Sequence, residues 1–88
     1  MLDEQTLAAV LSVARRIVNN EVAPYEGATA IWSLLAGEEG DYPEDLRIFV
    51  GLASEYQDHP HHREAYDRDI REEAQALLAR HRAGPGRQ

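Results

Sequence analysis

The sequence predicts an all-α protein, a small antiparallel bundle of four short helices, and three observations support this. Apolar residues recur at steps of three and four along four separate segments, which is the period of a helix with one buried face. No segment alternates with period two, and no Asn-Gly or Asp-Gly step marks a hairpin. The segments are joined by about three to six residues, a spacing that favours antiparallel neighbours.

The first helix is expected over residues 3–20. Asp3 is suited to cap its first turn, since a carboxylate accepts hydrogen bonds from free N–H groups there. Asn19 and Asn20 are suited to end it, because Asn tolerates the left-handed conformation found just past helix ends. The expected buried stripe consists of Leu7, Val10, Leu11, Ala14, Ile17 and Val18.

The second and third helices are expected over residues 24–37 and 43–57, each opened by a proline. Pro24 and Pro43 stand at first helical positions, where the proline ring sets a helical φ in advance. Gly51 lies inside the third helix, either because another helix approaches closely or because its cost of about 1 kcal/mol is tolerated. The expected stripes are Ala28, Ile31, Trp32 and Leu35 in the second helix, and Leu46, Phe49, Val50, Ala53 and Tyr56 in the third.

The fourth helix is expected to start at Pro60 or His61 and to end at His81. Residues 1–82 then form a single helical domain, and residues 83–88, "AGPGRQ", are expected to be a disordered tail. The expected seam of this helix consists of Tyr66, Ile70, Ala74, Leu77 and His81, spaced like a coiled-coil seam.

The composition excludes several classes of function. The 88 residues include no cysteine, which removes disulfides, thiolate catalysis and cysteine-based zinc sites. No run of 18 apolar residues could cross a bilayer, and the acidic start lacks the positive region of a signal peptide. We therefore expect a cytoplasmic protein. The sequence also shows no phosphate-binding loop and no dinucleotide fingerprint, so no cofactor is expected.

The charge of the chain is strongly uneven. The net charge is −7, and residues 1–44 contribute eight acids against two arginines. Such a half repels nucleic acid and anionic lipid, so neither is an expected partner. All nine basic residues are arginine, which suits either recognition of anions in two-point contacts or a bias of the genome toward arginine codons.

The stretch "QDHPHHREAYD" holds three of the four histidines of the chain. Asp58, His59 and His62 could form a turn-based metal site or the core of a small hydrolase, with Glu55 close by. The alternative is that Asp58 or His59 caps the fourth helix, Pro60 enters its first turn, and the histidines are solvated. The spacing favours the helix start, since metal ligands on a helix sit three or four residues apart.

A second candidate is the segment 37–45, "GEEGDYPED", with five acids in nine positions. The acids do not follow the spacing of oxygen ligands that a calcium-binding loop requires. The segment is either a surface for a basic protein partner or a solvated loop before a helix whose first turn favours acids. The candidate partner-binding residues are Glu38, Glu39, Asp41, Tyr42 and, further along the chain, Glu55.

Two phrases of the sequence resemble a family of small bacterial helical proteins of unknown function. They are "PYEGATAIWSLL" (24–35), which contains P-x-E-G-A-x-x-I, and "FVGLASEYQDHP" (49–60), which contains F-x-G-L-x-S-E. The resemblance implies a bacterial cytoplasmic helical protein and directs attention to Glu26, Gly27, Ser54 and Glu55. An acid such as Glu55 near a helix C-terminus is unfavourable to the helix dipole, which calls for pairing with Arg15, Arg16 or a partner.

A fainter resemblance is to colicin-type immunity proteins, which are also short, acidic four-helix chains with a Tyr-Pro step near an acidic loop, as in "DYP" (41–43). It implies an inhibitor that covers a basic active site through residues 37–45. The favoured hypothesis is broader: a non-catalytic acidic helical module that binds a protein, either a basic partner or a second copy of itself.

Overall fold

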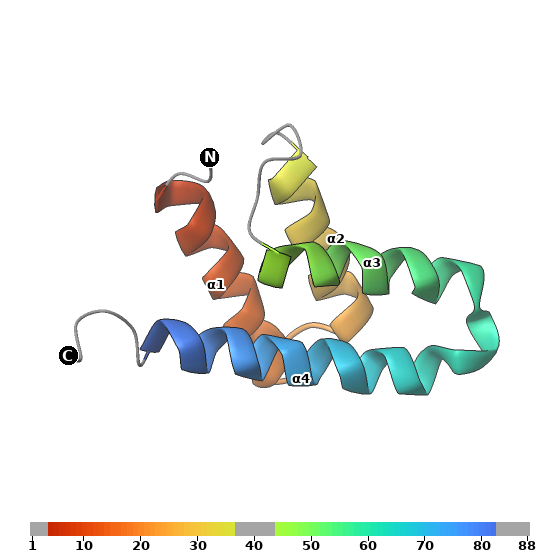
Figure 1. Cartoon of the computed structure of the whole chain (residues 1–88). Coiled ribbons are helices and arrows are strands. Elements are labelled where there is room, and N and C mark those ends of the chain that lie inside the picture. Colours follow the sequence, from red (N-terminus) through yellow and green to blue (C-terminus); the bar gives the residue numbers. More distant parts are fainter. Residues whose placement is uncertain (1–3, 37–43, 83–88) are drawn as a thin grey trace.

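The computed structural model describes residues 4–36 and 44–82, and the regular structure of these ranges is helical throughout. The prediction of a small all-α bundle is therefore confirmed (Figure 1). Each helix lies within about three residues of its expected bounds. The elements are α1 (Glu4–Val18), α2 (Pro24–Ala36), α3 (Glu44–Asp58), a short 3₁₀ helix η1 (Pro60–His62) and α4 (Arg63–Arg82).

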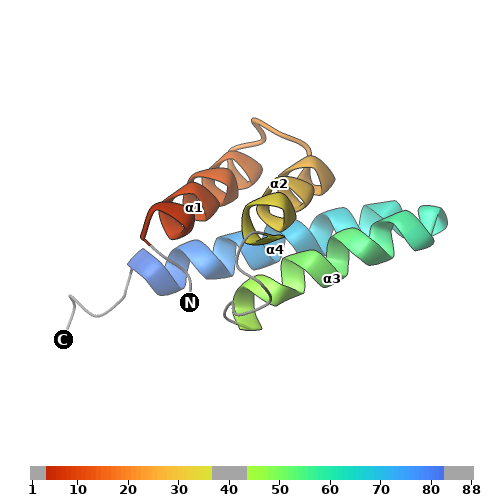
Figure 2. The same ribbon diagram turned by 90° about the horizontal axis from the view of Figure 1, so that it is seen from above.

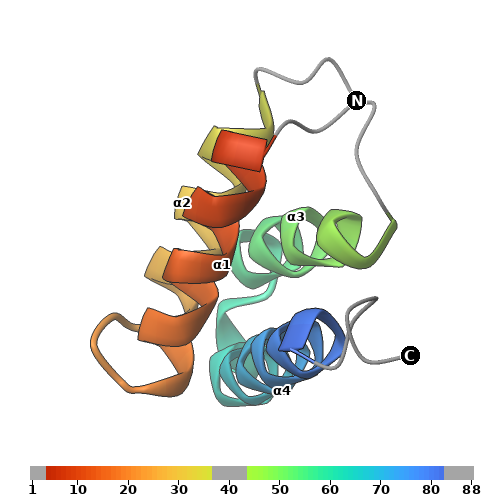
Figure 3. The ribbon, with the colours of Figure 1, turned by 90° about the vertical axis from the view of Figure 1, so that its left-hand side faces the viewer.

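The four helices form two antiparallel hairpins that lie crosswise in two layers. Helices α1 and α2 make one layer, and the longer pair α3 and α4 makes the other (Figures 1 and 2). Figure 3 shows α3 and α4 nearly end-on, with α1 in front of α2 on one side of them. Helix α1 packs on α2 and α4, and α2 packs on all three other helices. The far end of the α3–α4 hairpin extends past the α1–α2 layer.

The core lies between the two layers and is built from the predicted stripes. Its buried members are Val10, Ala14, Ile17, Ala28, Ile31, Leu35, Leu46, Phe49, Ala53, Ile70, Ala74 and Leu77. Trp32 is half-buried against this core, in keeping with a packing role. One seam position was wrong: His81 is exposed. It lies in the last turn of α4, where its ring lines a surface recess beside α1 and does not reach the core.

Helix α1 ends as its two asparagines predict. Asn20 has a left-handed backbone with φ of 63°. Its N–H donates to the carbonyl of Ile17 at 3.1 Å, and the N–H of Glu21 donates to that of Arg16 at 2.8 Å. This pair of bonds is the Schellman motif, which satisfies carbonyls left free at the helix end. It turns the chain back toward α2 within five residues.

Gly27 allows α1 and α2 to pack closely at the base of their hairpin. The residue is buried, and a Cβ placed on it would lie 2.5 Å from Cδ1 of Ile17 and closer still to Cγ1. Real Cβ atoms do not approach other carbons to this distance. A larger side chain at this position would force the buried Ile17 or the two helices to shift, so glycine suits this close helix–helix contact.

Among the residues that the structure describes, no helix is both long and apolar enough to cross a membrane. The expected cap at Asp3, the expected disordered tail at residues 83–88, and most of the acidic segment 37–45 lie outside the described residues.

Candidate functional site

The histidine-rich stretch forms the corner between α3 and α4. Helix α3 continues to Asp58, so this residue ends a helix and does not cap the next one. The N–H of His59 donates to the carbonyl of Glu55 at 2.9 Å, and the N–H of His62 donates to the carbonyl of His59 at 3.0 Å. His59 stands at the N-cap position without a side-chain hydrogen bond, and Pro60 follows in the first turn. The stretch is thus a helix start, as the spacing favoured, but neither Asp58 nor His59 provides a side-chain cap.

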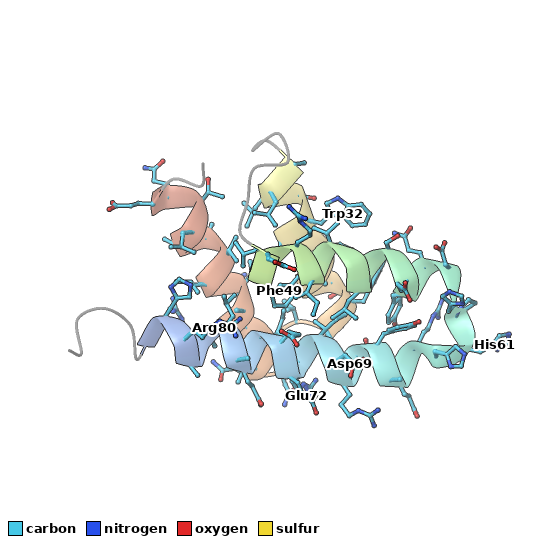
Figure 4. All side chains as sticks on the ribbon, viewed as in Figure 1. Trp32, Phe49, His61, Asp69, Glu72 and Arg80 are labelled. Atoms are coloured by element: carbon cyan, nitrogen blue, oxygen red, sulfur yellow. The ribbon has the colours of Figure 1, made fainter. Side chains whose placement is uncertain are left out.

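The three histidines of this corner are exposed, and the rings of two of them lie near one tyrosine. The ring centroids of His59 and His62 are 6.3 Å apart, and each lies 6.4 Å from the ring of Tyr66. His61 points outward at the tip of the hairpin (Figure 4). Across residues 4–36 and 44–82, no group of three His, Cys, Asp or Glu side chains is placed to hold a metal ion. Asp58, His59 and His62 are thus near in sequence without forming such a group.

Glu55 and Tyr66 connect the two helices just inside the corner. The phenol O–H of Tyr66 on α4 donates a hydrogen bond to Oε1 of Glu55 on α3, at 3.0 Å. This bond, aided by burial and by the negative charges of Glu55 and Asp69, raises the pKa of Tyr66 above its ordinary value. A carboxylate stabilises the neutral phenol that donates to it and disfavours the phenolate. The unfavourable position of Glu55 at the end of α3 is explained by this contact and not by Arg15 or Arg16.

A stack of aromatic side chains fastens the start of α2 to the same corner. The rings of Tyr25 and Tyr56 lie 4.2 Å apart between centroids and 14° from parallel. The guanidinium carbon of Arg63 lies 5.4 Å from the centre of the Tyr56 ring, within range of a cation–π attraction. The side-chain amide of Gln57 donates to the hydroxyl of Tyr25 at 2.7 Å.

Sequence reasoning missed this stack. The apolar stripe identified Tyr56 as a packing residue, and Tyr25 follows the proline that opens α2. Nothing local to either residue indicates that their rings meet, because the residues lie 31 positions apart. The contact follows only once α2 lies against the end of α3.

The outward side of α3 carries a small apolar and acidic face. Ile48 is 39% exposed, and it is the large hydrophobic residue that is exposed among the described residues. Gly51 is exposed, and a Cβ added to it would meet no atom within 4 Å. Leu52 is half-buried and Glu55 exposed. These four residues follow helical spacing and define what we call the α3 face. Gly51 is thus exposed, and it is not a crossing point of two of the described helices.

Asp67 and Arg71 on α4 attract each other electrostatically, but each has one buried polar atom without a hydrogen bond. Oδ1 of Asp67 and Nε of Arg71 are covered by neighbouring atoms, and neither has a hydrogen-bond partner among the described residues. Burial raises the pKa of Asp67, and the opposing attraction of Arg71 and Arg63 is smaller. A carboxylate that loses water without gaining full hydrogen bonding destabilises the folded state when it is charged.

Four of the candidate partner-binding residues, Glu38, Glu39, Asp41 and Tyr42, lie outside the described residues. The described part of the chain begins again at Glu44, the first residue of α3. The acidic segment therefore leads directly into the helix that carries the α3 face.

No protein-family model, curated protein or solved structure matches the chain. The resemblances to small bacterial helical proteins and to colicin-type immunity proteins stay predictions.

Proposed function

We propose that this chain is a non-catalytic, acidic helical module that binds a basic protein partner through the α3 face. The single observation that carries the proposal is the combination of Ile48 and Gly51 on the exterior of α3. An exposed isoleucine offers apolar surface to a partner, and a neighbouring glycine with open space above it lets a partner's backbone come close.

The charges around the α3 face favour a basic partner. Glu55 is exposed at one end of the face, and its hydrogen bond from Tyr66 leaves its second carboxylate oxygen able to accept further bonds. The negative charge of Asp69 acts on the same tyrosine. The acidic segment 37–45 precedes the other end of the face in the sequence. An apolar face with an acidic residue at its rim complements a cationic amphipathic surface and speeds its capture at low salt.

A cationic amphipathic helix of lysine and leucine is a suitable probe, with a glutamate–leucine helix as its opposite-charge control. Backbone amide shifts of the protein, followed by NMR during titration, should be largest at Ile48, Gly51, Leu52 and Glu55. Binding should weaken as salt is added, because the rim charges are screened. A net charge of −7 attracts any cation, so the position of the shifts is the decisive readout.

Two matched variants separate the face from the overall charge. Ile48→Lys adds one positive charge on the α3 face, whereas Ala79→Lys adds the same charge at an exposed position of α4. The first should weaken probe binding about tenfold or more, as expected for loss of a central apolar anchor. The second should change it little. Equal weakening in both variants, or shifts spread over the exposed side of α4, would reject the α3 face as the binding surface.

Self-association is the second form of the same hypothesis. Light scattering of the wild type and of Ile48→Lys distinguishes the two forms. A dimer that the substitution dissociates means that the α3 face binds a second copy of the chain. A monomer in both cases leaves a different protein as the partner.

A further inference from the structure

A recess lies between α1 and the last turns of α4, at the end of α4 away from the histidine corner. It has a volume of about 200 Å³ and is lined by Leu11 and Arg15 of α1 and by Leu78 and His81 of α4. The two leucines are half-buried and form its apolar part, while Arg15 and His81 are exposed. The crossing of α4 with α1 that creates it is visible in Figure 1.

The two segments that supply the lining of this recess are basic in an otherwise acidic chain. Residues 5–18 and 74–82 contain no Asp or Glu, although the chain as a whole has a net charge of −7. The same two segments contain four arginines and one histidine. Arg15 and His81 are the charged or titratable side chains that line the recess itself, so a bound group of negative charge is favoured there.

We propose that the recess binds a small monocarboxylic acid with a short apolar chain. The guanidinium of Arg15 presents two parallel N–H donors that match the two oxygens of a carboxylate. His81 adds an N–H donor whether its ring is neutral or protonated. The alkyl chain lies against Leu11 and Leu78, from which it displaces water.

The size of the recess limits the length of the ligand. Sites for drug-sized molecules occupy about 300–1,000 Å³, so the 200 Å³ recess suits an acid of about four to six carbons. Each methylene that is fully buried strengthens binding about fourfold. Hexanoate should therefore bind more tightly than butanoate, by a factor of up to about sixteen for two methylenes.

The test is an NMR titration of the ¹⁵N-labelled protein with butanoate, hexanoate and hexan-1-ol. Hexanoate should give saturable shifts at Leu11, Leu78 and His81, with butanoate weaker and hexan-1-ol weaker still. Arg15→Gln should weaken hexanoate binding about tenfold, the loss expected for one charge-assisted contact. The exposed position of Arg15 lets the variant keep its fold, which a thermal melt by circular dichroism verifies.

Arg16→Gln is the matched control because it removes the same charge from the next residue of α1. Arg16 lines a different, shallow groove between α1 and α2, together with Val13 and Leu34. Its substitution should leave hexanoate affinity within about twofold of the wild type, since Arg16 is exposed to solvent and does not line the recess. Equal losses in both arginine variants, equal affinity for hexan-1-ol, or shifts that never saturate would each overturn the proposal. The site is independent of the α3 face, so its failure does not bear on the proposed function.

Discussion

Replacing Gly27 by alanine should destabilise the protein, although alanine is the better helix former. The added Cβ would lie within 2.5 Å of Ile17 Cδ1 and nearer to Cγ1, and Ile17 is fully buried. Overfilling a packed core costs about 1–3 kcal/mol, and the buried isoleucine cannot swing into solvent to relieve it. The intrinsic gain from Gly to Ala within a helix is at most about 1 kcal/mol. We expect a net loss of about 1–2 kcal/mol.

Gly51→Ala is the matched control, since it makes the same chemical change in the middle of α3. No atom lies within 4 Å of its Cβ position, and the residue is exposed. Only the propensity term remains, so this variant should gain about 0.5–1 kcal/mol. The two glycine variants should therefore shift stability in opposite directions.

Thermal and urea denaturation followed by circular dichroism at 222 nm measures both shifts. In a domain of this size, 1 kcal/mol moves Tm by about 4–8 °C. The double variant with Ile17→Ala tests the contact directly, because alanine lacks both Cγ1 and Cδ1. Ile17→Ala should cost less in the Gly27→Ala background than in the wild type, which is the signature of coupled neighbours. A Gly27→Ala protein as stable as the wild type, or strict additivity in this cycle, would refute the close packing of α1 on α2.

Three further variants test polar and backbone features of the bundle. Tyr66→Phe removes the hydrogen bond to Glu55, and the pKa of Tyr66 is raised above 10.0 in the folded protein. The stability advantage of the wild type over the Phe variant should therefore be full below pH 10.0 and disappear as the pH rises through the higher folded pKa. A pH-independent difference in Tm between the two proteins would contradict this. Asp67→Asn should raise Tm at pH 7, because burial raises the pKa of Asp67 and its charged form therefore destabilises the fold. Thermal melts at pH 3, below the ordinary pKa of an aspartate, should show no such gain in Tm. Asn20→Val should lose about 1–2 kcal/mol in urea denaturation, because φ at this position is 63°, whereas Asn20→Gly should be neutral or stabilising; equal stabilities would argue against the left-handed turn.

Local sequence signals were most informative where one helix decides the outcome by itself. The stripe from Val10 to Ile17 follows from a period of 3.6 residues, and these positions are buried. The end of α1 at its asparagines follows from the tolerance of Asn for positive φ, and Asn20 adopts it. Pro24 opens α2 where a fixed φ is an advantage.

The same signals were insufficient where contacts join separate elements. His81 continues the seam of α4 by spacing, yet it is exposed because the last turn of α4 lies at the edge of α1. Glu55 looked unpaired from its helix position, and its donor is Tyr66 on the next helix.

Gly27 and Gly51 show this difference between local and tertiary information within one residue type. The sequence by itself determined that each stands inside a helix, together with the number of helices, their buried stripes and the acidic charge of the chain, because these depend on local spacing and composition. Only the tertiary structure decided that Gly27 meets Ile17 while Gly51 faces solvent. The physical reason is that spacing along a helix fixes which residues share a side, whereas the crosswise packing of two hairpins fixes which sides meet.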